Sequence, residues 1–396
     1  MCTSIFTATT DRKHVLARTM DYSFPLDFDV VYLPRTYSWK SSADHAEHES
    51  NYGFLGAGRS LGTSYFVADG VNEHGLAIAE LYLPQKAVYQ KQADENKINL
   101  APHEFITWAL GEFKSIADLK KKLSKVNLMD VAAPLIDTVT PLHWIITDTS
   151  GNCMVIEPTQ KVLHLKENPV GVMTNTPLLE WHIENLSNYL NVRPKQYEPQ
   201  QFGNYTANAF SQGTGTMGLP GGYTPPERFV RATFFKEHID PAKNEIEAVT
   251  NATKILSTVQ IPKGIVVTSG DQEDYSQYTG MMCNESQTYY YTDYNNTRIS
   301  KVELTKELLA RTTPKIFVVK KVEDMAILSA KKVSPKEVAA DLSDKTEVSS
   351  TLLDMVGQEV LGGLNSAKQG TLDEDTQQTA DQLLAELGQL KDKLGK

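Results

Sequence analysis

Residues 2–22 read CTSIFTATTDRKHVLARTMDY, and this stretch decides how the chain begins to fold. Residues 2–8 and 14–20 are rich in β-prone side chains, and the polar run 11–13 between them is typical of a turn. We therefore predict a β-hairpin. In a short hairpin the end of the second strand lies beside the start of the first, so residue 2 is expected to meet residues 18–21.

Three further hairpins are predicted downstream. Pairs of β-prone runs flank turn-forming residues at 63–71 and 76–83, at 142–147 and 153–157, and at 287–292 and 298–304. Apolar residues recur at helical spacing in 105–113, 116–126, 226–237 and 246–259, and Ser115 with Asp118 is a typical helix start. Repeated hairpins favour antiparallel sheets, so we expect an α+β protein whose sheets are covered by helix layers.

The composition is that of a globular protein with 396 residues, 40% of them hydrophobic, and a formal net charge of −10. This acidic balance argues against nucleic acid and membranes as partners. No apolar run approaches the roughly 20 residues that cross a bilayer, and no secretory signal opens the chain, so we expect a cytoplasmic protein. Three cysteines, Cys2, Cys153 and Cys283, cannot form a disulfide framework.

The composition changes near residue 325. Residues 326–396 contain no aromatic side chain and carry a net charge of −4. Leucine and valine form two short helical stripes there, at 353–364 and 383–394. We predict a catalytic domain at 2–325 and an acidic, partly helical extension at 326–396. A mobile tail is favoured over a docking or oligomerisation helix pair, because the stripes are short and lack aromatic anchors.

Cys2 stands directly after the initiator methionine. Removal of Met1 leaves a thiol and a free α-amine on one residue. An α-amine titrates at about pH 7.7–8.0 and can act as a base near neutrality, and a thiol needs such a base to react as the thiolate. Arg18 would favour the thiolate and Asp21 could orient the amine. An ordinary cross-strand Arg and Asp is the alternative interpretation of this pair.

Several short motifs occur in a familiar order. Together with Cys2 they resemble the choloylglycine hydrolase family of N-terminal nucleophile amide hydrolases, which includes penicillin V acylases and bile salt hydrolases. The resemblance covers about residues 2–320 and implies an αββα four-layer sandwich of two antiparallel sheets. The segments that carry it are ARTMDY (17–22), GVMTNTP (171–177), GLPGG (218–222) and RFV (228–230).

The resemblance also implies roles for matching residues. Cys2 would be the nucleophile and its amine the proton shuttle, with Asp21 holding both groups and Arg18 placing positive charge near the sulfur. Asn175 would donate its side-chain amide to the oxyanion, a contact worth about 10²–10³ in rate. Arg228 would complete the charged cluster.

Tyr82 separates branches of the family. Bile salt hydrolases typically carry Asn at this position, whereas penicillin V acylases of the Gram-positive type resemble this chain in carrying Tyr. The backbone N–H of Tyr82 would be a second oxyanion donor, and its ring, with Met20, would contact the acyl group. Hydrolysis of penicillin V is therefore the leading interpretation. The alternatives are conjugated bile salts, or acyl-homoserine lactones and other N-acyl amino acids.

No cofactor is implied, and no metal site is expected because the histidines show no HExxH or CxxC-type spacing. The expected partner is a small amide with an apolar acyl group, and the family leads us to expect a homotetramer. Two readings lie outside this class. One is a Cys–His thiol hydrolase built on Cys153 or Cys283, and the other is a non-catalytic scaffold of the same fold.

Overall fold

The computed structural model describes residues 1–62 and 64–329 and the single positions 382, 385 and 389. Residues Met1–Asp324 form one compact unit. The predicted extension 326–396, including both leucine-rich stripes, lies outside the described residues apart from 326–329 and those single positions. Its separation from residues 2–325 stays a prediction.

The opening hairpin forms as predicted and contributes two adjacent strands to a seven-stranded antiparallel sheet. A strand distant in sequence, β18, lies on the other side of β2 and is joined there by β17. In spatial order the sheet contains β14 (Val172–Met173), β1 (Cys2–Ala8), β2 (His14–Tyr22), β18 (Glu273–Cys283), β19 (Thr288–Asp293) and β20 (Asn296–Glu303), with β17 (Val266–Val267) beside β18.

The second sheet has eight antiparallel strands and includes two of the other predicted hairpins. In spatial order it contains β13 (Lys166–Glu167), β12 (Cys153–Ile156), β11 (Leu142–Thr147), β8 (Ala77–Tyr82), β7 (Ser64–Asn72), β6 (Phe54–Leu61), β3 (Asp29–Leu33) and β21 (Lys315–Phe317).

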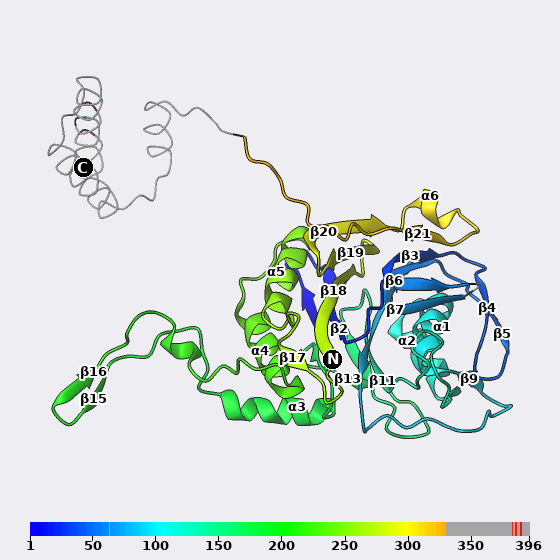
Figure 1. Ribbon diagram of the computed structural model, residues 1–396, viewed down its shortest axis with the longest axis horizontal. Coiled ribbons are helices and arrows are strands. Elements are labelled where there is room, and N and C mark those ends of the chain that lie inside the picture. The colour runs from blue at the N-terminus through cyan, green and yellow to red at the C-terminus, as the bar shows by residue number, and fades with distance from the viewer. Residues whose placement is uncertain (63, 330–381, 383–384, 386–388, 390–396) are drawn as a thin grey trace. The chain divides into compact units, whose positions relative to one another are not determined.

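The two sheets pack face to face between helices, which confirms the αββα sandwich (Figure 1). Leu16 and Met282 of the first sheet and Ile145 of the second are completely buried in the core cluster that joins them. Helices α4 (Pro225–His238) and α5 (Glu245–Ser257) cover the outer face of the first sheet. Helices α1 (Phe105–Glu112) and α2 (Ile116–Leu123) share a second buried cluster with the other sheet. As predicted, Ser115 caps α2, because its hydroxyl accepts from the Asp118 N–H at 3.3 Å.

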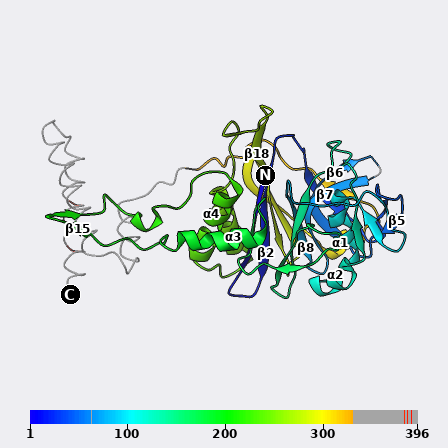
Figure 2. The ribbon, with the colours of Figure 1, turned by 90° about the horizontal axis from the view of Figure 1, so that it is seen from below.

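Short elements complete the fold. They are β4 (Ser38–Lys40), β5 (Glu47–Glu49), β9 (Ile98–Leu100), β10 (Val126–Leu128), α3 (Leu179–Asn185), β15 (Gln200–Phe202), β16 (Tyr205–Ala207), α6 (Lys306–Leu309) and the 3₁₀ turns Pro102–Glu104, Leu186–Tyr189 and Thr214–Thr216. The β15–β16 hairpin lies at the far end of an excursion from the sheets (Figure 2). Among the helices of the described residues, none combines the length and apolar character of a bilayer-spanning segment.

Candidate active site

The register of the opening hairpin places the predicted nucleophile. Cys2 begins β1 directly opposite Met20, near the end of β2. Because alternate residues of a strand share a face, Arg18 points to the same side as this pair. The Cys2 Sγ lies 3.0 Å from the Arg18 Nη2 and only 3% of the residue is exposed. Sulfur and guanidinium therefore meet as the sequence predicts.

Arg18 is completely buried between the sheets and uses all three of its nitrogens. Its Nη1 donates to Asp69 Oδ2 at 2.9 Å and to the Tyr278 hydroxyl at 3.0 Å, and its Nη2 also donates to the Glu80 carbonyl at 3.0 Å. Burial opposes the charged form, yet Tyr278, Cys2 and Asp69 together raise the pKa of Arg18 well above its ordinary value. The thiol thus has a fixed cation beside it.

A β-bulge in β18 directs Ser276 and Tyr278 to opposite faces of this sheet. Ser276 pairs with Asp21 and Tyr278 with Met20, with one extra residue between them. Without the bulge Ser276 and Tyr278 would share a face. With it, Tyr278 reaches Arg18 on the inner face, while the Ser276 hydroxyl donates to Asp21 Oδ1 at 2.5 Å on the outer face.

The Asp21 carboxylate is held beside the chain start. Its Oδ2 accepts from the Thr19 hydroxyl at 3.2 Å, and no hydrogen bond joins it to the Cys2 nitrogen in the described network. Met1 continues the hairpin ladder instead, since its amine donates to the Asp21 carbonyl at 2.6 Å and its carbonyl accepts from the Asp21 N–H at 3.0 Å. The predicted role of Asp21 toward a free Cys2 amine stays a prediction.

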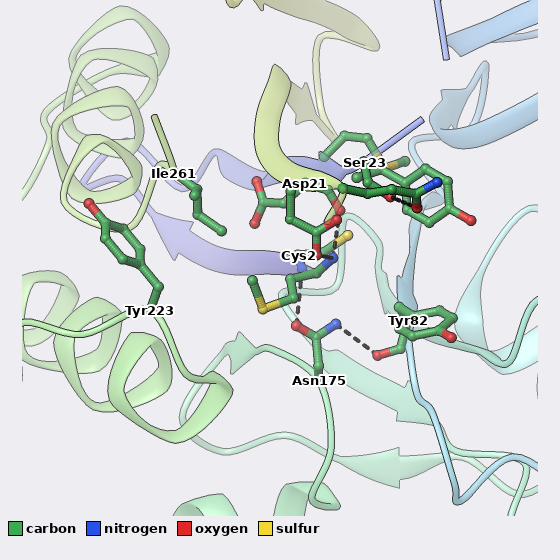
Figure 3. A network of polar contacts seen from close by, with 12 residues as sticks. Cys2, Asp21, Ser23, Tyr82, Asn175, Tyr223 and Ile261 are labelled. Atoms are coloured by element: carbon green, nitrogen blue, oxygen red, sulfur yellow. Dashed lines mark hydrogen bonds and ion pairs between the residues drawn. The ribbon is translucent and has the colours of Figure 1, made fainter. Parts of the chain in front are cut away.

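Asn175 reaches the nucleophile from the loop after β14. Its Oδ1 accepts from the Cys2 N–H at 3.0 Å and its Nδ2 donates to the Tyr82 carbonyl at 2.7 Å (Figure 3). The Oδ1 also accepts from Arg228 Nη2 at 2.6 Å. Two donors fix which end of the amide is oxygen. The Nδ2 carries a second hydrogen, so the amide can donate to another acceptor beside Cys2.

Arg228, on the first turn of α4, ties the site together. Its Nη1 donates to the Cys2 carbonyl at 2.5 Å and to the Thr3 hydroxyl at 2.6 Å, while its Nη2 contacts Asn175. Complete burial lowers the pKa of Arg228, and Asp21 and Cys2 oppose that shift. One guanidinium therefore joins β1, the Asn175 loop and α4.

A pocket adjoins Cys2, which forms part of its wall. Met20 and Tyr82, the two predicted substrate-contacting residues, both line it. Apolar side chains dominate the rest of the wall, including Leu135 and Ile136 from a loop that the sequence did not indicate. The lining is completed by Cys2, Arg18, Asp21, Tyr22, Leu26, Phe66, Glu80, Leu81, Thr140 and Leu142.

Two acidic residues beside Arg18, Asp69 and Glu80, were not predicted from the sequence. Asp69 is completely buried and accepts from both Tyr278 and Tyr289 hydroxyls as well as Arg18. Burial raises the pKa of the Glu80 carboxyl well above its ordinary value, and its Oε2 has no hydrogen-bond partner among the described residues. A single acidic residue inside an apolar strand was the available signal at both positions.

The other two cysteines lie elsewhere. Both are buried, and neither lines the pocket beside Cys2. Burial raises the pKa of Cys153 to about 12 and that of Cys283 to about 11, so both thiols stay protonated near neutrality. This environment opposes the alternative of a thiol hydrolase built on either one.

A cysteine at the start of a strand, inside a sandwich of two antiparallel sheets between helices, defines an amide hydrolase of the N-terminal nucleophile class. Residues 2–317 match the family described as linear amide C-N hydrolases, choloylglycine hydrolase family, and the chain belongs to this family. Its reaction class is therefore hydrolysis of a linear amide C–N bond.

Curated relatives and solved structures agree with this assignment. A bile salt hydrolase/transferase of Clostridium perfringens is 34% identical over 312 residues, which cover 78% of this chain and 94% of that protein. The crystal structure of a C2A mutant of the conjugated bile acid hydrolase from Clostridium perfringens has a TM-score of 0.77 at 31% identity, covering 83% of this chain and all of that one. A penicillin V acylase of Pectobacterium atrosepticum is 23% identical, with 74% and 77% covered.

Proposed function

We propose that this protein hydrolyses conjugated bile salts, releasing the steroid acid and its amino-acid partner. The pocket lined by Cys2 carries the proposal, because its largely apolar wall suits an apolar acyl group. The bile salt hydrolases among the relatives support it further. Penicillin V, the leading interpretation from the sequence, has weaker support from these relatives and becomes the second candidate.

The reaction begins once Met1 is removed. The Cys2 thiol gives its proton to the α-amine, and the thiolate attacks the amide carbon. Asn175 Nδ2 and the Tyr82 N–H donate to the oxyanion that forms. The C–N bond then breaks, the leaving amine takes the proton from the α-ammonium, and a thioester remains.

Water completes the turnover. The neutral α-amine takes a proton from the attacking water, the new C–O bond forms and the C–S bond breaks. The acid leaves and the thiol is regenerated, so atoms and protons balance. Arg18 contributes by holding a positive charge 3.0 Å from the sulfur in both half-reactions.

Penicillin V remains a candidate because of Tyr82. Its half-buried ring lines the pocket beside Cys2, where it can stack on a phenoxyacetyl group. An apolar pocket discriminates weakly between acyl groups of similar size. One site can therefore accept both substrates at different rates.

The test is side-by-side turnover of glycine- and taurine-conjugated bile salts and penicillin V, with protein whose mass shows that Met1 is absent. We expect faster cleavage of the bile salts and loss of most activity in Cys2→Ser. Faster cleavage of penicillin V would overturn the substrate assignment in favour of the second candidate. If protein with a free Cys2 cleaves neither, both assignments are wrong, and another N-acyl amide or the non-catalytic scaffold takes their place.

A further inference from the structure

Two buried histidines hold consecutive carbonyls of the loop that carries Asn175. We propose that His143 and His182 are positioning residues, which fix this loop so that the Asn175 amide meets the oxyanion. The proposal rests on the proposed role of Asn175 in linear amide hydrolysis, whichever of the two amides is the better substrate. Neither histidine lines the pocket, so both act through Asn175.

His143 lies on β11 and is 1% exposed. Its Nε2 is 3.0 Å from the Thr174 carbonyl oxygen. A carbonyl can only accept, so Nε2 carries the hydrogen and donates. On the other side of the ring, Nδ1 lies 3.7 Å from Glu157 Oε1.

His182 lies on α3 and is 2% exposed. Its Nε2 donates to the carbonyl of Asn175 itself at 2.9 Å. Its ring stacks on Phe229 with centroids 4.7 Å apart and planes 16° from parallel, and Phe229 follows Arg228 on α4. Burial lowers the pKa of His182, which keeps the imidazole neutral near pH 7.

Glu157 links the elements that carry both histidines. Its Oε1 accepts from the Leu179 N–H, at the first residue of α3, at 3.0 Å, and its Oε2 accepts from Lys166 at 3.1 Å. The same carboxylate faces His143. One buried anion therefore sets the start of the helix that delivers His182 and lies beside the ring of His143.

The two histidines act on the backbone of the loop at Thr174 and Asn175, and we call this pair of contacts the histidine clamp. Arg228 and the Cys2 N–H act instead on the Asn175 side chain. An oxyanion donor works only when it lies about 2.7–3.1 Å from the oxygen. A misplacement of about 1 Å can cost ~10²-fold in rate. A loosened loop should therefore slow the chemical step more than it weakens substrate binding.

The test replaces each imidazole in two ways. His182→Phe keeps a ring against Phe229 but removes the donor, and His182→Gln restores a donor near the position of Nε2; His143→Leu and His143→Gln form the second pair. We expect kcat to fall about 10- to 100-fold in the donor-less variants, with KM within about 2-fold of wild type. The Gln variants should recover most of the loss.

Two further readouts separate positioning from general damage. The rate at which iodoacetamide alkylates Cys2 should not change, and amide hydrogen exchange of the peptide 172–178 should become faster in the donor-less variants. In an Asn175→Ala background, His182→Phe should cause no further loss of kcat, because its effect passes through that side chain.

The proposal would be overturned if His182→Phe lowered kcat further in the Asn175→Ala background. Unchanged hydrogen exchange of the loop in the donor-less variants would overturn it as well. The hydrogen-exchange measurement needs no substrate. It therefore tests whether the histidine clamp holds the loop even if the wild type cleaves neither test amide. That last result would instead count against the proposed function.

Discussion

The buried contact between Arg18 and Asp69 offers the sharpest test of how the site is held. Asp69→Asn keeps the shape of the side chain and removes its charge. Unit charges 2.9 Å apart attract by about 6 kcal/mol at an effective dielectric constant of about 20. The asparagine retains a carbonyl oxygen for one donor, and removal of one partner of a buried pair generally costs about 3–5 kcal/mol. We expect Asp69→Asn to lower the free energy of unfolding by about 3–5 kcal/mol.

Urea unfolding followed by tryptophan fluorescence measures the free energy of unfolding. Two further variants provide a scale for the loss in Asp69→Asn. Tyr278→Phe removes one neutral hydroxyl from the same cluster and should cost about 1–3 kcal/mol. Glu303→Gln breaks an exposed pair with Lys301 and should leave the transition unchanged. An Asp69→Asn transition equal to wild type, or a loss smaller than that of Tyr278→Phe, would refute the reasoning.

Three other predictions address the same unit. Burial raises the folded-state pKa of Glu80, so the contribution of this carboxyl to stability should be lost as pH rises above about 4.3, the unfolded value. Glu80→Gln should therefore match wild type at pH 4 and exceed it at pH 7–8 in thermal melts, and equal stability at both would contradict this. Removal of residues from 330 onward should leave kcat within about 2-fold of the full chain, because every described site residue lies in Met1–Asp324; an inactive truncation would place the extension in the catalytic unit. Iodoacetamide at pH 7 should label Cys2 while sparing Cys153 and Cys283, which peptide mass mapping would check.

The elements that could be predicted are those marked by residues close together in the sequence. Turn residues between β-prone runs located the hairpins, and the Ser115 cap located α2. The strand β18 was missed because its sequence is polar near the start and its bulge breaks the alternation of faces. The helix α3 was missed because it has only seven residues and buries just Leu179 and His182.

Some site residues could likewise be predicted from nearby sequence, and others could not. Cys2 and Arg18 could be paired from the sequence because a hairpin makes distant residues local. Asn175 and Arg228 were found only through the family resemblance, since no periodicity relates position 2 to 175 or 228. Asp69 was missed because an acidic residue within a strand gives no sign of which sheet it faces.

The ladder that joins Met1 to Asp21 also bears on timing during synthesis. In the folded chain both the amine and the carbonyl of Met1 are engaged, and the residue is half-buried. An aminopeptidase must draw an N-terminal residue into its own cleft, which is easiest while β1 is still unpaired. Asp21, the partner of Met1 in this ladder, is synthesised 19 residues after Cys2. At about 5–20 residues per second this interval lasts roughly 1–4 s. The proposed removal of Met1 is therefore easiest early in synthesis, before β1 and β2 pair.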